Sequence, residues 1–308
     1  MNFKIEPDVL ELYKMSKVIS RLGIFFIGIP LVLCLVFLNY FNHLPLHIFL
    51  ILSSLLVCNE LYNIFSYKTK LLNRALILVL NTALPFCAAL IAVLPVFTKL
   101  TFYSAEHILV LVLVVEILIA LSVEVFSASD FYDSLMKMAA SSFILVYSGF
   151  LMTYISRFSI ARMGEKDISN QLIVAFLLMV YFCDSFAWFF GVLFGKNNRG
   201  IVKASPNKSL VGFFGGIAGS IGAGILVRCI WPEIFSGNII KIIITGAVIS
   251  VSSITGDLTE SVFKRSAGVK DSGTMIPGRG GVLDSFDSLL MSAPVFYYLI
   301  KVFYGFSF

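Results

Sequence analysis

The chain has 308 residues, of which 58% are hydrophobic and 13% are charged, and its formal net charge is +5. Globular proteins have about 25% charged residues, so this composition, with a mean hydropathy of +0.94, excludes a soluble fold. Lys and Arg lie in short segments between apolar runs, which indicates membrane orientation and excludes a nucleic-acid partner.

Apolar runs of about 20 residues are long enough to cross a hydrocarbon core of about 30 Å as α-helices. The chain contains about nine such runs, and they lack the alternation of apolar and polar residues that outer-membrane strands show. We therefore predict an all-α, polytopic integral membrane protein with about nine transmembrane helices and no cleaved signal peptide. The expected spans are residues 22–38, 44–65, 75–97, 107–126, 137–155, 171–194, 210–230, 239–256 and 286–303.

Lys and Arg are concentrated on one side of the expected bundle. With a cytoplasmic N-terminus, the cytoplasmic segments include residues 66–74, 195–209 and 257–285, which hold most of the cations. The positive-inside rule then predicts a cytoplasmic N-terminus and cytoplasmic motif loops, and we expect a bacterial inner membrane. Segment 156–169 disagrees with this rule, because it places Arg157, Arg162 and Lys166 on the outer side.

Two connections assigned to the cytoplasm, residues 195–209 and 257–285, are long, and connections of that length usually carry function. Both lie in the C-terminal part of the chain. We therefore divide the chain into residues 1–170, an N-terminal region of about five transmembrane helices, and residues 171–308, a transmembrane region with two cytoplasmic motif loops that carry the chemistry.

The second loop begins with charged residues at helical spacing. If the eighth span continues beyond the membrane surface, Asp257, Glu260, Ser261 and Lys264 share one face of it. Asp284 and its neighbour one turn later, Asp287, begin the ninth span, where the positive end of the helix dipole favours carboxylates. The sequence thus predicts a group of carboxylates at one membrane surface.

Clustered carboxylates suit Mg²⁺, which prefers oxygen ligands and shares its shell with water and phosphates. Lys264, Arg265, Lys270 and Arg279 would repel a bare metal ion but suit a polyphosphate. The glycines within residues 277–281 allow backbone N–H groups to approach phosphate oxygens. Ordinary surface ion pairs and turn glycines remain the alternative interpretation of this segment.

The first loop follows a span that contains an ionisable residue, Asp184. Placing Asp184 at that depth costs at least about 2.5 kcal/mol, so we expect it to face a polar cavity or a buried hydrogen-bond partner. Lys208, just before the seventh span, fits either a phosphate contact or an interfacial anchor. Four glycines of that span predict close helix packing: Gly212, Gly215, Gly216 and Gly219. Glu60 and Glu124 lie near helix ends, where we expect them to reach water.

One run of the chain closely resembles the signature of the phosphatidate cytidylyltransferase (CDP-diacylglycerol synthase) family. This run is Ser261-x-x-Lys264-Arg265-x4-Lys270-Asp271-x-Gly273-x3-Pro277-Gly278-x-Gly280-Gly281-x-x-Asp284-x-x-Asp287. Two earlier segments resemble two further motifs of that family, in the same order. They are Asp184-Ser185, and Ser205-Pro206-x-Lys208-Ser209 with the glycines that follow. The first half of the chain is similar to the family only as a set of apolar helices.

This resemblance implies transfer of CMP from CTP to phosphatidate, giving CDP-diacylglycerol and pyrophosphate, in a protein surrounded by membrane lipids. It implies Mg²⁺ as cofactor, bound by Asp257, Asp284 and Asp287, and leaves a monovalent cation and a homodimer open. The implied catalytic residues are Asp257, Lys264, Arg265, Lys270, Asp271, Arg279, Asp284 and Asp287. The implied substrate-binding residues are Asp184, Ser205, Lys208, Ser209, Ser261, Gly278, Gly280 and Gly281.

The chain departs from the family pattern at three positions: Arg279 stands where the family usually has His, Ser285 where it has Arg, and Val211 where it has Glu. Two other functions are weighed against the resemblance. A CTP-dependent polyprenol or dolichol kinase would phosphorylate its lipid and leave CDP. A transporter would use Asp184 and Glu116 as its pathway, but it would leave the glycine-rich loop without a role, and no internal repeat is visible.

Overall fold

The computed structural model describes residues 23–98, 105–278 and 280–308, and the N-terminal segment, residues 99–104 and Arg279 lie outside the described part. The regular structure of the described residues is helical apart from a short antiparallel hairpin of β1 (Arg162–Met163) and β2 (Lys166–Asp167), and loops connect the helices. The prediction of an all-α fold is confirmed.

Eight described helices are long and apolar enough to cross a membrane. They are α3 (Leu44–Ser66), α4 (Arg74–Phe97), α5 (Ala105–Ser127), the continuous helix Ser134–Ile160, α8 (Ser169–Phe194), α9 (Leu210–Ile230), α10 (Ile239–Ser266) and α11 (Leu283–Tyr304). Ser134–Ile160 consists of α6 (Ser134–Ile144), η2 (Leu145–Phe150), α7 (Leu151–Arg157) and η3 (Phe158–Ile160). The protein is therefore an integral, multi-pass membrane protein.

The first expected span is shorter in the described residues than the other eight. It is helical through η1 (Ile24–Gly28) and α2 (Ile29–Phe37), and the residues before Gly23 lie outside the described part. At the other end of the chain, α10 continues to Ser266, beyond the expected end at Gly256. The condition under which Asp257, Glu260, Ser261 and Lys264 share one helix face is thus met.

The helix ends are explained by local hydrogen bonds. The side chain of Asn73 accepts from the backbone N–H groups of the first turn of α4, and Asn238 caps α10 in the same way. Helix α11 ends at Tyr304, and the residue that follows, Gly305, has a φ of +68°, a conformation that glycine adopts without strain. These caps satisfy backbone groups that have no partner within the helix.

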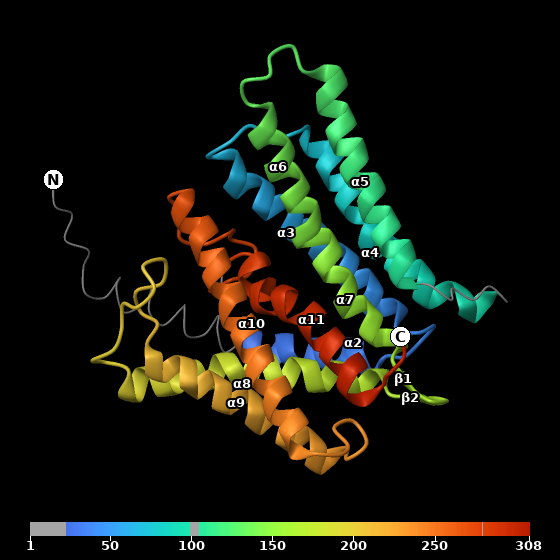
Figure 1. The fold of residues 1–308 in the computed structure, drawn as a ribbon, viewed down its shortest axis with the longest axis vertical. Helices are drawn as coiled ribbons and strands as arrows, with labels where there is room; N and C mark the ends of the chain where they lie inside the picture. The colour runs from blue at the N-terminus through green and yellow to red at the C-terminus, as the bar shows by residue number, and fades with distance from the viewer. Residues whose placement is uncertain (1–22, 99–104, 279) are drawn as a thin grey trace.

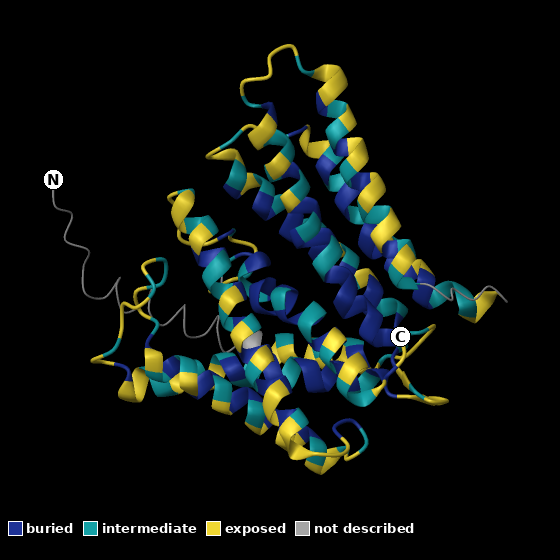
Figure 2. Ribbon diagram, in the orientation of Figure 1, coloured by how far each residue is buried: buried dark blue, intermediate teal, exposed yellow. Residues whose placement is uncertain are grey.

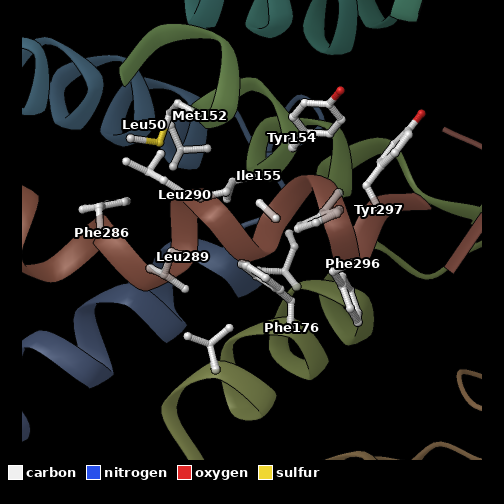
Figure 3. Packing of buried hydrophobic residues seen from close by; sticks show 14 of the residues in the cluster. Leu50, Met152, Tyr154, Ile155, Phe176, Phe286, Leu289, Leu290, Phe296 and Tyr297 are labelled. Atoms are coloured by element: carbon white, nitrogen blue, oxygen red, sulfur yellow. The ribbon is translucent and has the colours of Figure 1, made fainter. Parts of the chain in front are cut away.

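Helix α11 is at the centre of the fold, because it contacts α3, α7, α8 and α10. Figure 1 shows α8 and α9 side by side at one end of the molecule, α3 to α7 on the other side, and α10 and α11 between them. Apolar side chains from α3, α7, α8 and α11 meet around Leu50, Ile155, Phe176 and Leu290 (Figure 3). The last helix of the chain is therefore packed both against α3 and α7, on one side, and against α8 and α10, on the other.

Outer faces of the helices carry exposed apolar side chains. On α5, Leu111, Leu118 and Val125 are all more than half exposed, and Figure 2 shows exposed residues along the outer side of this helix. Apolar surface of this extent is stable in hydrocarbon and not in water. The outer faces therefore lie against lipid.

The glycines of α9 bring it close to α8, as the sequence predicted. A Cβ added at Gly219 would lie 2.6 Å from the backbone oxygen of Phe182, whereas a Cβ at Gly222 would have no atom within 4 Å. Gly219→Ala is expected to lower the free energy of unfolding by about 1–3 kcal/mol, because the helices must move apart. Gly222→Ala is the matched control, since alanine is the better helix former and meets no neighbour. Thermal unfolding in detergent compares the two, and equal stability of both variants would contradict this account.

Candidate active site

Helices α10 and α11 are antiparallel and pack closely at the site. Gly256 makes this possible, because a Cβ at that position would collide with the backbone oxygen of Asp287. The hydroxyl of Ser288 also donates to the backbone oxygen of Ser253, over 3.2 Å. This contact brings Asp287 of α11 beside the turn of α10 that begins with Asp257.

One face of α10 carries the charged residues that the sequence placed together. Nζ of Lys264 lies 2.7 Å from Oε2 of Glu260, and the hydroxyl of Ser261 lies 3.5 Å from Oδ1 of Asp257. The i, i+3, i+4 and i+7 spacing accounts for both contacts. The predicted shared face is confirmed.

Lys264 joins α10 to the start of α11. Its Nζ lies 2.5 Å from Oδ1 of Asp284 in addition to its contact with Glu260, and the three side chains are 11%, 9% and 2% exposed. The Lys264 cation thus lies between two buried carboxylates. Charged groups at this depth need partners, because removing them from water costs several kcal/mol per ion.

The second oxygen of Asp284 holds the loop between the helices. Oδ2 accepts hydrogen bonds from the backbone N–H of Ser272 over 3.0 Å, from its hydroxyl over 2.8 Å, and from the N–H of Gly281 over 2.7 Å. Gly280 has a φ of +120°, and a Cβ there would lie 2.5 Å from Oδ2 of Asp284. The glycine at position 280 is therefore required both by the backbone conformation and by the adjacent carboxylate.

The first motif loop contacts α10 at Asp257. Oδ2 of Asp257 lies 2.6 Å from Nζ of Lys208, in the segment before α9. Asp287 is followed by Ser288, whose hydroxyl donates to the backbone oxygen of Ser253, and the hydroxyl of Ser253 donates to Oδ1 of Asp184 over 3.3 Å. Carboxylates from α8, α10 and α11 and a cation from the first loop therefore converge.

The remaining predicted residues differ in their surroundings. Ser209 is buried, and its hydroxyl accepts from the N–H of Gly212 as the N-cap of α9. Arg265 donates to the backbone oxygens of Ala204 and Val269, which joins the first loop to the end of α10. Exposed or partly exposed positions, where a ligand has access, are occupied by Ser205, Lys270, Asp271 and Gly278. Arg279 lies outside the described residues.

The expectation that Glu60 and Glu124 reach water is wrong. Glu60 is 7% exposed and accepts hydrogen bonds from the second motif loop, and Glu124 is buried against Lys137 and Ser134 at 2.6 and 2.7 Å. Glu116 is also buried, and its oxygens accept no hydrogen bond from the described residues. The high cost of a carboxylate in an apolar span is the signal that could have identified Glu60 as part of a polar network.

The described residues contain no group of three or more His, Cys, Asp or Glu side chains arranged to hold a metal ion. Mg²⁺ does not require such a group, because it is usually bound by one or two carboxylates with the remaining oxygens from water and substrate phosphates. Asp257 and Asp287 provide that kind of donor set, since both are carboxylates and Gly256, the residue before Asp257, is packed against the backbone of Asp287. The residues present therefore fit a Mg²⁺ ion that arrives with a phosphate ligand.

Fold and site together define a multi-pass membrane protein with a mixed acidic and basic centre at the end of its spans. Residues 19–303 match the model of the cytidylyltransferase family, and the chain belongs to that family, a family of nucleotidyltransferases. The match extends far into the N-terminal helices, where the motifs carried no signal.

Individual relatives agree with the family match. The chain is 32% identical over 223 residues to a phosphatidate cytidylyltransferase of Thermotoga maritima, which covers 71% of this chain and 78% of the relative. It is 38% identical over 132 residues to a phosphatidate cytidylyltransferase of Pseudomonas aeruginosa, covering 43% of this chain and 48% of that protein. An uncharacterized protein of Escherichia coli, YnbB, is 38% identical over 163 residues, covering 51% of this chain and 53% of the relative. The resemblance seen in the motifs is confirmed.

Proposed function

We propose that this protein transfers CMP from CTP to phosphatidate and releases pyrophosphate. The observation that carries the proposal is that Lys208, from the loop before α9, Asp257 of α10 and Asp287 of α11 converge beside the Lys264 and Asp284 pair. Family membership and the relatives named phosphatidate cytidylyltransferase support the same activity.

The reaction needs positioning more than proton transfer. A phosphomonoester with a second pKa of about 6 is largely dianionic at neutral pH, so the phosphatidate oxygen is already a nucleophile. It forms a bond to the α-phosphorus of CTP, and the bond from that phosphorus to the oxygen of the β-phosphate breaks. Lys208 and Lys264 reduce the repulsion between the two anions, and Arg265 and Lys270 are proposed to assist at the rim. Arg279, which lies outside the described residues, is proposed as a further phosphate contact on its motif alone. Ser261 and Gly278 are proposed as neighbouring hydroxyl and backbone donors. Gly280 and Gly281 shape the loop, because their N–H groups donate to the backbone oxygen of Ile276 and to Oδ2 of Asp284.

Asp257 and Asp287 are the carboxylates that would hold Mg²⁺, with Asp184 in their vicinity. A Mg²⁺ ion in this place would neutralise charge on the triphosphate and orient it. Both oxygens of Asp284 are occupied, by Lys264 on one side and by Ser272 and Gly281 on the other. Asp284 can therefore bind the metal ion only after Lys264 has turned toward the phosphates. All of these groups come from one chain, and a homodimer is not part of the proposal.

We place the site at the cytoplasmic surface of a bacterial inner membrane, as the distribution of Lys and Arg favours. The acyl chains of phosphatidate then remain in the bilayer beside the exposed apolar faces, while the headgroup reaches the polar centre. In this proposal residues 171–308 supply the reacting groups, and residues 1–170 support them.

The test uses purified protein, phosphatidate, Mg²⁺ and CTP labelled in the cytosine ring. The expected result is label in the lipid with one pyrophosphate released per lipid, and loss of both on chelation of Mg²⁺. A parallel reaction with CTP labelled at the γ-phosphate tests the alternative: label in the lipid from this CTP, with release of CDP and no cytosine label in the lipid, would show a lipid kinase instead. Solute flux without nucleotide consumption would show a transporter.

A further inference from the structure

We propose that Glu60, on α3, is a positioning residue for the second motif loop and, through it, for Asp284. This inference rests on the proposed function for its effect on catalysis, but its structural part stands on contacts alone. Glu60 lies in the N-terminal region, for which the sequence indicated no role beyond completing the bundle.

Three donors from the loop and from the start of α11 converge on the Glu60 carboxylate. Oε1 accepts from the backbone N–H of Val282 over 2.9 Å. Oε2 accepts from the N–H of Leu283 over 2.8 Å and from the hydroxyl of Ser272 over 2.9 Å. A carboxylate is suited to this position because it only accepts hydrogen bonds.

Glu60 takes the place of an N-cap for α11. The N-cap residue itself, Val282, has no side chain that can accept a hydrogen bond, and the first N–H groups of a helix have no partner within it. Glu60, 222 positions earlier in the chain than Val282, satisfies two of these groups with a negative charge at the positive end of the helix dipole. The orientation of the first turn of α11, which carries Asp284 and leads to Asp287 in the next turn, therefore depends on α3.

The hydroxyl of Ser272 connects Glu60 to the proposed catalytic centre. Its Oγ lies 2.9 Å from Oε2 of Glu60 and 2.8 Å from Oδ2 of Asp284, and it has one proton to share between them. The two carboxylates are thereby held on opposite sides of one hydroxyl. A change in the position of the Glu60 carboxylate therefore changes the position of Asp284, through Ser272, and then that of Lys264, which contacts Asp284.

Two glycines of the motif loop make room for the Glu60 carboxylate. A Cβ at Gly273 would lie 2.6 Å from its Oε1, and a Cβ at Gly281 would collide with its Oε2. Glycine at these two positions is thus explained by the approach of Glu60 as well as by phosphate binding. The absence of a side chain at these two loop positions thus matches the position of the Glu60 carboxylate on α3.

The matched pair of variants is Glu60→Gln and Glu124→Gln. Both remove the charge of a buried carboxylate in the N-terminal region, but Glu124 contacts Lys137 and Ser134 and not the motif loop. For Glu60→Gln, the Mg²⁺ concentration needed for half-maximal activity and the KM for CTP are expected to rise by about 10-fold to 100-fold. In Glu124→Gln both values are expected to stay at the level of the unaltered protein.

Hydrogen exchange without substrate tests the structural part separately. Exchange of the amides in residues 268–283 is expected to be faster in Glu60→Gln and unchanged in Glu124→Gln. Unchanged exchange in Glu60→Gln, or the same increase in both variants, would overturn the inference. If the unaltered protein transfers no CMP but exchange depends on Glu60 as expected, the proposed function fails and the positioning of the loop does not.

Ser272→Ala provides a second, smaller change in case Glu60→Gln folds poorly. It leaves the two backbone contacts of Glu60 in place and removes the link to Asp284. We expect it to raise the same Mg²⁺ and CTP values, and we expect its effect and that of Glu60→Gln to be non-additive in the double variant, because both act on one network. Additive effects would contradict a connection through Ser272.

Discussion

Asp284→Asn is expected to reduce cytidylyl transfer by about 10²-fold to 10³-fold while the protein still inserts into the membrane. Oδ1 of Asp284 faces the Lys264 cation, and Oδ2 faces three hydrogen-bond donors. An amide nitrogen can accept from neither side, so in either orientation asparagine opposes a donor with a donor. The negative charge that holds Lys264 near the loop is also lost. Initial rates with labelled CTP, at saturating Mg²⁺, measure the effect.

Asp133→Asn is the control for this variant. Asp133 pairs with Lys70 over 2.8 Å, and the two side chains are 39% and 76% exposed. Exposed pairs of this kind contribute little, so activity is expected to match that of the unaltered protein. Full activity in Asp284→Asn would remove Asp284 from the site.

Lys264→Met is expected to lower the free energy of unfolding by about 3–5 kcal/mol and to abolish activity. Methionine has a similar length but leaves Glu260 and Asp284 buried together without the intervening cation. Two unpaired carboxylates at this depth repel each other and have lost their solvation by water. Equilibrium unfolding in mixed detergent micelles measures the change in stability.

Two further variants separate charge from packing. Lys70→Met removes a lysine from the exposed pair with Asp133, and stability is expected to remain as in the unaltered protein. Adding Glu260→Gln to Lys264→Met removes one of the two unpaired charges and is expected to restore part of the lost stability. If the double variant were no more stable than Lys264→Met, repulsion between the carboxylates would not be the cause of the loss.

The spans of this protein could be predicted closely because each depends on local composition. The run that ends at residue 230 predicts the end of α9 at Ile230, and the end of α4 at Phe97 also agrees. The end of α10 could not be read from hydropathy, because the helix continues to Ser266 through charged residues that are stabilised by contacts with α11. The shared face of Asp257, Glu260, Ser261 and Lys264 was therefore expected only on the condition that the helix continues.

The partners of the site residues were not predictable in the same way. Lys264 and Asp284 were both identified from their motif, but as contacts for a nucleotide and a metal, whereas the structure pairs them with each other. Ser209 was identified as a substrate contact and serves as the N-cap of α9. Glu60 lies outside the motifs, and its side chain was expected to reach water.

By itself the sequence determined that this protein is a helical membrane protein, where most of its spans lie, and which two loops carry the signature of its family. These properties follow from the free energy of transferring each segment into lipid and from spacing along single helices, which are local. Only the tertiary structure decided that α11 lies between the two halves and that Glu60 supports the loop beside Asp284. Those contacts join residues more than 200 positions apart, and they depend on how whole helices pack against one another, which no local pattern records.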